Sequence, residues 1–338
     1  MADAGIDRSK FRVLCYNILA EFHAWTDVGR SFNYPYCPEK FLESGYRRKL
    51  VLSQLAEYNA DILCLQEVDE NAYRSLFLPE LSKHGYSGTF VRKSDIPEGC
   101  ATFYRSCSLT LIVSEQIVLS DALRSERNSD LYNKIKCNEK LLETVISRGT
   151  SLSMMLLETT ANELLVVINV HLFWDDRGGH IRAIQSQLVV REMEHFIQRC
   201  MISDTNLANK LLARIVAGDY NSDPYSAAVQ LMTDGKVPSN HSDWFAMGEE
   251  EYQPGIELLG KIKYQSACGY PAYTSFVPEF RKCIDYIFID PKVLQVIEIH
   301  PLSQSYEETT RYTALPNEFA PSDHIPLVVD LKFNLQCK

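Results

Sequence analysis

The chain has 338 residues, of which 46% are hydrophobic and 23% charged, a composition typical of a globular protein with a sizeable apolar core. Its formal net charge of −10 excludes a protein that coats duplex DNA through a broad basic face. A small phosphate-bearing substrate held with a divalent cation remains compatible with this charge, and no apolar run is long enough to predict membrane insertion.

Strands and helices alternate along the first half of the chain. Residues 11–19 (FRVLCYNIL) are apolar and β-rich, which predicts a strand that ends near Asn17. In residues 39–58 the apolar positions recur near helical spacing, which predicts a helix with residues 47–49 (RRK) on its polar side. We expect further strands over residues 62–65, 86–91, 101–104 and 109–119, a helix over residues 71–83, and a charged helical insertion over residues 121–148.

The alternation continues through the second half. A hairpin is predicted over residues 153–172 with its turn at Ala161-Asn162, and a helix after Gly178-Gly179. Residues 234–282 are punctuated by glycine and proline and are expected to be mostly loop. We also expect a strand up to Gly218, a helix over residues 224–233, and strands over residues 283–289, 293–299 and 325–331.

This order of elements predicts the domain organisation. Strands alternate with helices and no linker interrupts them, so we expect one α/β domain over residues 11–334, preceded by a flexible segment over residues 1–10. The ten cysteines form no C-x-x-C pair, and several lie inside apolar runs. That pattern favours reduced thiols in an intracellular protein over a disulfide framework or a zinc site.

The stretch RIVAGDYNSDP, residues 214–224, carries two polar side chains where a buried strand meets a turn. Side chains at positions i and i+2 of an extended chain point to the same side, so Asp219 and Asn221 share one face. A carboxylate there can orient water, and an amide can donate to a phosphate oxygen. The alternative is a strand-to-helix turn in which both side chains only satisfy backbone groups.

Similar polar residues lie at or beside the ends of other predicted strands, where a lone polar group costs free energy unless it has a partner. Any single one of them is compatible with a structural role. Together they are all of the metal-ligand, base or phosphate-contact type, so a converging site is the simplest explanation. The set consists of Asn17, Glu67, His171, Asp219, Asn221, Asp285, Asp323 and His324.

The oxygen-bearing members of this set suit a divalent metal ion. Glu67, Asp323 and Asn17 offer hard oxygen ligands, and cysteine is absent from the set, so we expect Mg²⁺ or Mn²⁺ and not zinc. Such an ion would neutralise a phosphate oxygen and the leaving oxygen while a phosphodiester is hydrolysed.

The other members suit the attack of water on a phosphodiester. Asp219 would orient or deprotonate the water, while Asn221 and His171 would donate to phosphate oxygens in the transition state. Asp285 would keep the imidazole of His324 protonated beside the phosphate, because an acidic partner raises the pKa of a histidine.

Six short motifs carry a resemblance to a known superfamily, in its order and across nearly the whole chain. They are YN at 16–17, LQEV at 65–68, NVHL at 169–172, GDYNS at 218–222, IDYIF at 284–288 and SDH at 322–324. In these motifs the chain resembles the endonuclease/exonuclease/phosphatase superfamily. The resemblance implies two packed mixed β-sheets flanked by helices, a four-layer α-β-β-α sandwich, and the metal, water and phosphate roles given above.

Other stretches resemble the deadenylase branch of that superfamily, and within it the 2′,5′-phosphodiesterase type. They include YPYC at 34–37, YNAD at 58–61, HLFW at 171–174 and SACGYPAYT at 266–274. The resemblance implies a 3′-exoribonuclease that hydrolyses 2′,5′-oligoadenylate and 3′,5′-poly(A) tails to AMP. It also implies the mitochondrial matrix as the compartment, with the cytoplasm as the alternative.

Substrate selection is expected from aromatic side chains, because a purine base stacks on an aromatic plane. Phe280 lies five residues before Asp285, where the resemblance implies adenine stacking, and Trp174 is a candidate for the same pocket. The alternative for both is packing within the protein. The chain departs from the branch at Asp176, where members usually carry proline. Further candidate phosphate contacts, each with a solvated surface position as the alternative, are Arg47, Lys93, Arg105, Arg177, Arg182 and Arg281.

Two other functions remain compatible with the sequence. One is a phosphatase or esterase of the same superfamily that acts on a small phosphorylated metabolite. The other is a catalytically silent scaffold, which the presence of every motif residue disfavours. For the leading hypothesis the partner is single-stranded RNA or oligoadenylate, and we expect a monomer.

Overall fold

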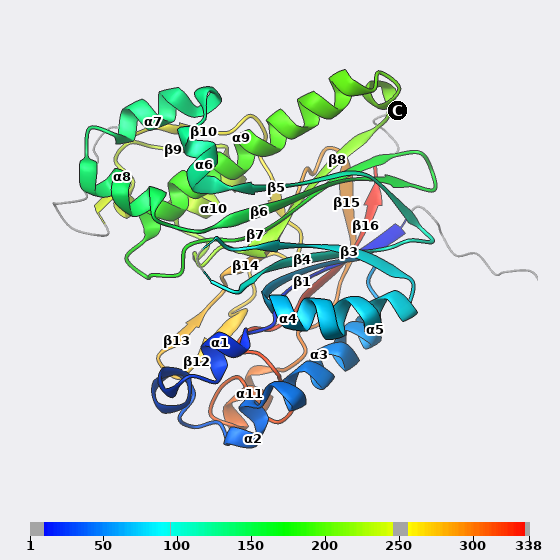
Figure 1. Ribbon diagram of the computed structural model, residues 1–338, viewed down its shortest axis with the longest axis vertical. Coiled ribbons are helices and arrows are strands. Elements are labelled where there is room, and N and C mark those ends of the chain that lie inside the picture. Colours follow the sequence, from blue (N-terminus) through cyan, green and yellow to red (C-terminus); the bar gives the residue numbers. More distant parts are fainter. Residues whose placement is uncertain (1–9, 95, 246–255, 335–338) are drawn as a thin grey trace, which may run out of the picture.

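The computed structural model describes residues 10–94, 96–245 and 256–334. Two six-stranded mixed β-sheets pack face to face, and helices cover the outer face of each sheet (Figure 1). This arrangement confirms the expected four-layer architecture. Of the segment expected to be flexible over residues 1–10, only Lys10 lies within the described ranges, and it begins the first strand.

The first sheet has the strand order β15-β16-β1-β2-β4-β3. β1 is parallel to β2 and antiparallel to β16, and Asn17 at the end of β1 pairs with Gln66. The ends of β1 and β2 therefore lie side by side. The strands span Lys10–Asn17 (β1), Ile62–Asp69 (β2), Tyr86–Arg92 (β3), Glu98–Arg105 (β4), Leu294–Ile299 (β15) and Leu327–Phe333 (β16).

The second sheet has the strand order β11-β14-β8-β7-β6-β5. β7 and β8 are parallel, β14 is antiparallel to β8, and β6 and β7 form the predicted hairpin with Asn162 at a φ of 68° in its turn. The strands span Leu109–Val118 (β5), Ser151–Thr159 (β6), Leu164–His171 (β7), Leu212–Asp219 (β8), Gln265–Ser266 (β11) and Asp285–Ile289 (β14).

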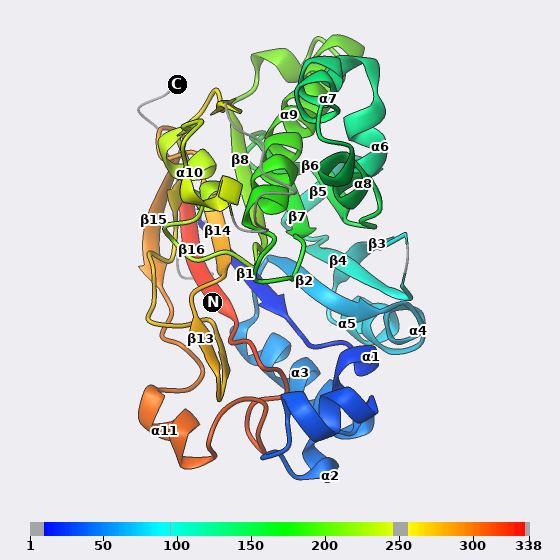
Figure 2. The same ribbon diagram turned by 90° about the vertical axis from the view of Figure 1, so that its left-hand side faces the viewer.

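Helices form the two outer layers. α9 (Gly179–Ser203) and α10 (Ala227–Asp234) lie on the second sheet, beside α6 (Leu119–Arg124), α7 (Ser129–Ile135) and α8 (Glu139–Ile146) (Figure 1). The first sheet carries α3 (Ser44–Tyr58), α4 (Glu70–Ala72) and α5 (Leu78–Lys83). Below them in both views lie α2 (Glu39–Leu42) and α11 (Tyr306–Arg311), while α1 (Glu21–Ala24) is at about the height of α3 (Figure 2). Single helical turns cover Gly29–Asn33, Tyr73–Phe77, Glu126–Asn128, Leu207–Asn209 and Ser242–Phe245.

The alternation of side chains along β1 explains how the layers pack. Val13 and Cys15 belong to the core between the two sheets, whereas Leu14 and Tyr16 belong to the core beneath α3 and α5. Successive side chains of a strand point to opposite faces, so a strand covered on both sides is apolar at every position. Residues 13–16 of β1 (VLCY) form an unbroken apolar run for this reason.

Three details differ from the sequence-based expectations. β8 does not stop at Gly218 but continues to Asp219. A Cβ on Gly218 would lie 2.0 Å from the carbonyl oxygen of Val170, so glycine here permits close approach of β7 and does not break the strand. On α3, Arg47 is buried (2% exposed) and not on the polar side.

The third difference concerns residues 234–282, which were expected to be mostly loop. Their described parts also contain short paired strands, each of two or three residues, which is too short to give a periodic pattern. They are β9 (Lys236–Val237) with β10 (Leu258–Leu259), β12 (Ser275–Val277) with β13 (Phe280–Lys282), and β11.

The described ranges contain neither a disulfide bond nor a helix that could span a membrane. The cysteines placed there are all free and most are buried. No helix of residues 10–94, 96–245 or 256–334 combines the length and apolar character needed to cross a membrane.

Candidate active site

The polar residues predicted at the strand ends gather at one edge of the two packed sheets. The first sheet supplies Asn17 from the end of β1 and Glu67 from β2. Glu67 has a φ of 53° and lies where the pairing of β2 with β4 shifts by a β-bulge, a feature that re-aims a side chain. The segment before β16 adds Asp323 and His324, and His324 forms an isolated bridge with Ser275.

The second sheet supplies the other part of the site. His171, the last residue of β7, is paired with Asp219, the last residue of β8. Asp285, the first residue of β14, is paired with the same Asp219 from the opposite side. The sheet register therefore sets Asp219 between two functional neighbours.

Asn17 joins carboxylates that come from both sheets. Its amide nitrogen donates to Glu67 Oε1 at 2.8 Å and to Asp219 Oδ2 at 3.0 Å. Its amide oxygen accepts from the backbone N–H of Leu19, and Glu67 Oε2 accepts from the backbone N–H of Ala20. The loop after β1 thus holds both side chains in place.

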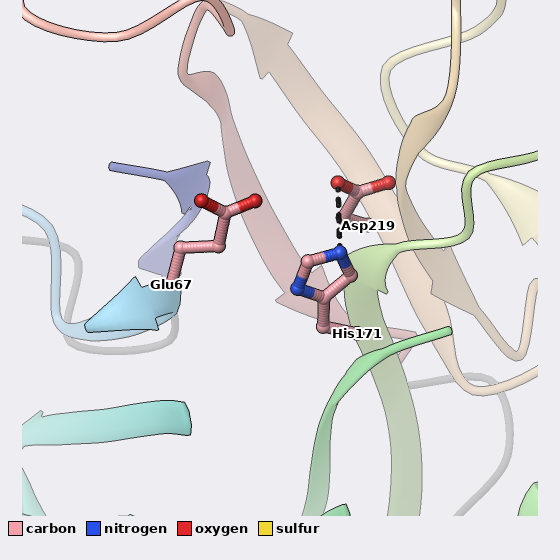
Figure 3. A group of neighbouring side chains, drawn as sticks. All are labelled: Glu67, His171 and Asp219. Atoms are coloured by element: carbon pink, nitrogen blue, oxygen red, sulfur yellow. Dashed lines mark ion pairs between the residues drawn. The ribbon is translucent and has the colours of Figure 1, made fainter. Parts of the chain in front are cut away.

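Asp219 is the point at which these contacts converge. Its Oδ2 lies 3.5 Å from His171 Nε2 (Figure 3). The same oxygen lies 3.7 Å from His324 Nε2 and accepts from the Asn17 amide. Its Oδ1 accepts from the backbone N–H of Asn221 at 2.8 Å. One carboxylate therefore faces an amide and two imidazoles, an arrangement that can hold a water or a phosphate oxygen.

Asp285 and His324 form a buried pair. His324 Nδ1 lies 2.8 Å from Asp285 Oδ2, while Asp285 Oδ1 is buried and without a hydrogen-bond partner in the described structure. Burial alone would lower the pKa of His324, but the charges of Asp285 and then Asp219 raise that pKa well above its ordinary value. His324 is accordingly a cation held beside Asp219.

Two other predicted residues take up positions next to this centre. Asn221 has a φ of 47°, and its side-chain nitrogen donates to the carbonyl oxygen of Leu172 at 3.1 Å. Asp323 Oδ2 accepts from the hydroxyl of Tyr34 at 3.0 Å. Because Tyr34 belongs to the segment between α1 and α2, that segment closes over the Asp323 side of the site.

Burial acts to raise the pKa of each carboxyl group here, but the groups respond differently to their neighbours. At Glu67 nearby cations, His23 first, overcome burial and lower the pKa, whereas the pKa values of Asp219 and Asp323 are raised. Burial, and then the charge of Asp285, raise the pKa of Asp219 to about 7. Burial also raises the pKa of Asp323, and the nearby charge of Glu67 adds to the rise. A carboxyl group whose pKa is raised in this way gains from an added cation.

The donor set fits a hard divalent ion. Glu67, His171 and Asp219 each have a possible ligand atom within 4.8 Å of the others, and in this group Glu67 and Asp219 supply oxygen atoms. Oxygen donors and unneutralised carboxylates favour Mg²⁺ or Mn²⁺. Asn17 could contribute its amide oxygen only by sharing it with the Leu19 N–H.

Two buried arginines bind backbone carbonyl oxygens beside the site. Arg47 donates to the carbonyl oxygens of Leu42, Ile18, Leu19 and Pro321, so it ties the loop after β1 to the segment before His324. Arg182 contacts Ser222 and the carbonyl oxygens of Phe173, Asp175 and Asp176, so it ties the loop after β7 to the loop after β8. Each arginine therefore fixes two loops of the site. Sequence reasoning placed both only among possible phosphate contacts, because the sequence does not reveal which cations are buried.

A second group of charged side chains packs behind Glu67 and His171, and the sequence predicted only one of its members, Lys93. Lys93 contacts Glu98 and His171, and His23 Nε2 lies 4.0 Å from Glu67 and 3.9 Å from Glu98. Burial, and then the charge of Lys93, lower the pKa of His171 to about 3, so His171 is neutral. Glu98 gave no signal in the sequence because it does not end an apolar run.

A cavity of about 300 Å³ adjoins the site at Asn221. Phe280 lines it, together with Tyr225, whose side chain is 90% exposed, and Asp176. Trp174 is 72% exposed and is not among the lining residues. The structure thus brings Phe280 and Asp176 to one cavity beside Asn221, and it leaves Trp174 outside the cavity wall.

The sequence matches a protein-family model and several curated proteins. The model of the Endonuclease/Exonuclease/phosphatase family matches residues 14–324. The chain is 39% identical to the 2′,5′-phosphodiesterase 12 of Rattus norvegicus over 96% of its own length and 52% of that protein. It is 28% identical to the CCR4-Not complex 3′-5′-exoribonuclease subunit Ccr4 of Kluyveromyces lactis, over 95% of this chain and 41% of that one. The chain spans about half the length of these curated relatives.

Solved structures share the fold. The crystal structure of ANGEL2, a 2′,3′-cyclic phosphatase, in complex with adenosine-2′,3′-vanadate matches with a TM-score of 0.76 at 21% identity, over 96% of each chain. The human Nocturnin catalytic domain with bound sulfate matches with a TM-score of 0.61 at 21% identity, over 97% of this chain and 96% of that one.

Proposed function

Because this chain belongs to the endonuclease/exonuclease/phosphatase family, we propose that it hydrolyses phosphodiesters of adenylate oligomers, with Mg²⁺ or Mn²⁺ as cofactor. The observation that carries the proposal is the position of Asp219, whose Oδ2 faces the Asn17 amide, His171 Nε2 and His324 Nε2. A carboxylate among converging donors suits a water that attacks phosphorus.

One side chain acts on the attacking water, and three others bind the phosphate. Asp219 orients the water and takes its proton as the water oxygen bonds to phosphorus and the bond to the leaving ribose oxygen breaks. His324, held protonated by Asp285, and the N–H groups of His171 and Asn221 donate to the phosphate oxygens on which charge develops. Such donors act in a buried site, where they cost no reorganisation during the reaction.

Glu67 and Asp323 would hold the metal ion, with Asn17 beside them. The bound ion would supply a positive charge that polarises the phosphate and stabilises the leaving oxygen. Support for this assignment comes from the raised pKa of Asp323 and from the oxygen atoms that these three side chains offer. Glu67 also belongs to a group of possible ligands with His171 and Asp219.

Adenylate is proposed as the substrate on two grounds. The cavity beside Asn221 is lined by Phe280, an aromatic plane that can stack a purine base. Curated relatives are named a 2′,5′-phosphodiesterase and a 3′-5′-exoribonuclease. We therefore infer release of AMP from 2′,5′-oligoadenylate and from 3′,5′-poly(A), the leaving group being the ribose oxygen of the preceding nucleotide.

Product analysis on paired 2′,5′- and 3′,5′-linked adenylate trimers tests the proposal. We expect Mg²⁺-dependent release of AMP, and its loss in Glu67→Ala and Asp219→Ala with the far-UV circular dichroism unchanged. Poly(U), NADPH and sphingomyelin serve as comparison substrates. Full activity of either variant, or a preference for NADPH or sphingomyelin over adenylate, would overturn the proposal, the second result in favour of a phosphatase or esterase that acts on small molecules.

The same proposal extends to partner and compartment. Single-stranded RNA or oligoadenylate is the partner, and we propose a monomer in the mitochondrial matrix, with the cytoplasm as the alternative. Light scattering of the purified chain and imaging of the tagged full-length protein test these two points.

A further inference from the structure

The side chain of Lys93 lies behind His171 and is only 15% exposed. It directly follows β3, and its backbone N–H donates to the carbonyl oxygen of Glu98, the first residue of β4, at 2.9 Å. Its ammonium lies 2.5 Å from Glu98 Oε1, and the Glu98 side chain is fully buried. The short connection between β3 and β4 thus carries an ammonium toward the site and anchors it there.

The same ammonium lies 3.2 Å from His171 Nδ1. A lysine ammonium has three N–H donors and no acceptor, so Nδ1 can only be the accepting partner. A neutral imidazole with an accepting Nδ1 carries its single proton on Nε2. Figure 3 shows Nε2 directed at Asp219 and the other ring nitrogen turned away from it.

We propose that Lys93 is a positioning residue that holds His171 in the tautomer with its proton on Nε2, so that this N–H is presented to the reacting phosphate. The proposal rests on the proposed function for its catalytic part, but not for the tautomer itself. Glu98 fixes Lys93, Lys93 fixes the ring of His171, and the ring offers one donor at the Asp219 side of the site. Without Lys93, either ring nitrogen of His171 could carry the proton. The tautomer with its proton on Nδ1 would direct the lone pair of Nε2, and no donor, at the phosphate.

The geometry distinguishes this role from a plain buried ion pair. A Lys–Glu ion pair needs only the contact between Nζ and Oε1. Here the ammonium also donates a second hydrogen bond, to the imidazole of His171. His171 has no carboxylate at Nδ1 in the described structure; its only carboxylate neighbour within ion-pair distance, Asp219, lies at Nε2. The ring orientation is therefore set from behind by a cation.

Nitrogen-15 NMR of the metal-free protein tests the tautomer without reference to catalysis. We expect the Nδ1 resonance of His171 in the range of a bare, accepting nitrogen and the Nε2 resonance in the range of a protonated one. In Lys93→Met/Glu98→Gln, which removes the ammonium without leaving Glu98 as an unpaired charge, we expect proton occupancy at Nδ1 to rise. In Lys93→Arg, which keeps a donor, the wild-type pattern should persist.

Kinetics on the adenylate trimer form the second arm. In Lys93→Met/Glu98→Gln we expect kcat to fall by about tenfold or more, as when one oriented donor is lost, with KM within about twofold, since a donor used only in the transition state leaves KM unchanged. Lys93→Arg should restore most of kcat. Lys83→Met, which removes an exposed lysine paired with Glu80, is the matched control and should change neither signal.

A wild-type spectrum with the proton on Nδ1, or an unchanged tautomer in Lys93→Met/Glu98→Gln, would overturn the proposal. If the double variant fails to fold, the wild-type spectrum alone still shows which ring nitrogen of His171 carries the proton. Absence of hydrolysis in the wild type with the expected spectra would refute the proposed function and leave the tautomer assignment standing.

Discussion

A buried imidazole among three carboxylates is the most charge-dependent feature of the site. Asp285, Asp219 and Asp323 all act to raise the pKa of His324, and Asp285 does so both by its charge and by a hydrogen bond. Burial opposes them, because it disfavours the charged ring. The protonated state of His324 therefore depends on Asp285 above all.

Replacement of that partner should shift the pH dependence. In Asp285→Asn the pKa of His324 falls, because the neutral amide removes the charge and burial then dominates. Since the group works in its protonated form, the decline of kcat with rising pH should begin at lower pH than in the wild type.

Proton NMR titration of the His324 ring in metal-free protein gives the same pKa directly. Asp130→Asn, at a surface ion pair with Arg191 on the far helix layer, is the control. An unchanged His324 pKa in Asp285→Asn would contradict the argument.

The base-stacking role proposed for Phe280 predicts a separate effect. Phe280→Ala should raise KM for adenylate by about 5- to 150-fold, the loss of one base–aromatic stack of about 1–3 kcal/mol, with little change in kcat. Steady-state kinetics on adenylate and uridylate trimers measure it. Tyr225→Ala and Trp174→Ala are informative partners, since Tyr225 lines the cavity and Trp174 does not. A larger KM effect from Trp174 than from Phe280 would reassign the stacking residue.

At the scale of residues, the sequence predicted the polar side chains at the ends of strands. It did not predict the side chains that contact these residues from the side away from the site. Asp219, His171 and Asp285 interrupt or end apolar runs, so their polarity stands out. Lys93 and Glu98 lie in an ordinary polar connection. Only the packing of β4 against β7 makes them neighbours of His171.

At the scale of elements, the site consists of loops held by buried donors. Arg47 has no carboxylate partner within ion-pair distance in the described structure, and four carbonyl oxygens surround its guanidinium. A planar group with five donors suits several acceptors at once, and lysine lacks that geometry. The guanidinium joins the segment after Asn17 to the segment before Asp323.

Removal of this guanidinium should destabilise the fold and loosen the site together. Arg47→Met leaves buried carbonyl groups unsatisfied, so we expect the free energy of unfolding to fall by about 3 kcal/mol or more, and kcat to fall as well. Urea unfolding followed by circular dichroism measures the first effect.

Lys49→Met on the same helix, where the side chain is exposed, is the matched control and should cost little. Wild-type stability in Arg47→Met would show that the carbonyl groups find other donors.

Element prediction succeeded where a periodic pattern was long enough and failed where a tertiary contact decided. β1, β7 and the hairpin of β6 with β7 follow from apolar runs and turn residues. Gly218 was interpreted as a strand break, but the close approach of Val170 is the reason for glycine there. The sequence predicts a polar face for Arg47 because nothing near it in the sequence shows that backbone carbonyl oxygens of other segments accept hydrogen bonds from its guanidinium.

At the scale of the whole molecule, neither sheet holds a complete site. Asn17, Glu67, Asp323 and His324 come with the first sheet, and His171, Asp219 and Asp285 with the second. Gln66 donates to Asn169 across the buried interface at 2.8 Å, close to both catalytic edges. Ligands that bind at this edge therefore contact both sheets and stabilise their packing.

Metal binding should accordingly stabilise the folded chain. At a Mg²⁺ concentration of about 100 times Kd the gain is about 2.7 kcal/mol, which corresponds to a rise in Tm of roughly 4 °C for a chain of this size. Differential scanning calorimetry with and without EDTA measures it.

Glu67→Ala should remove most of the rise, whereas the exposed-site variant Lys49→Met should retain it. An equal rise in Glu67→Ala would place the ion elsewhere.

The hydrogen bond from Ser322 Oγ to the carbonyl oxygen of Asn17, at 2.6 Å, joins residues 305 positions apart in the sequence. During synthesis on the ribosome, Asn17 leaves the exit tunnel long before Asp323, His324 and β16 are translated. The nascent chain therefore lacks its last metal-ligand candidate and its imidazolium until almost all of these residues have emerged. The candidate site is therefore assembled only after residues 322–324 have left the tunnel, however early its other members are translated.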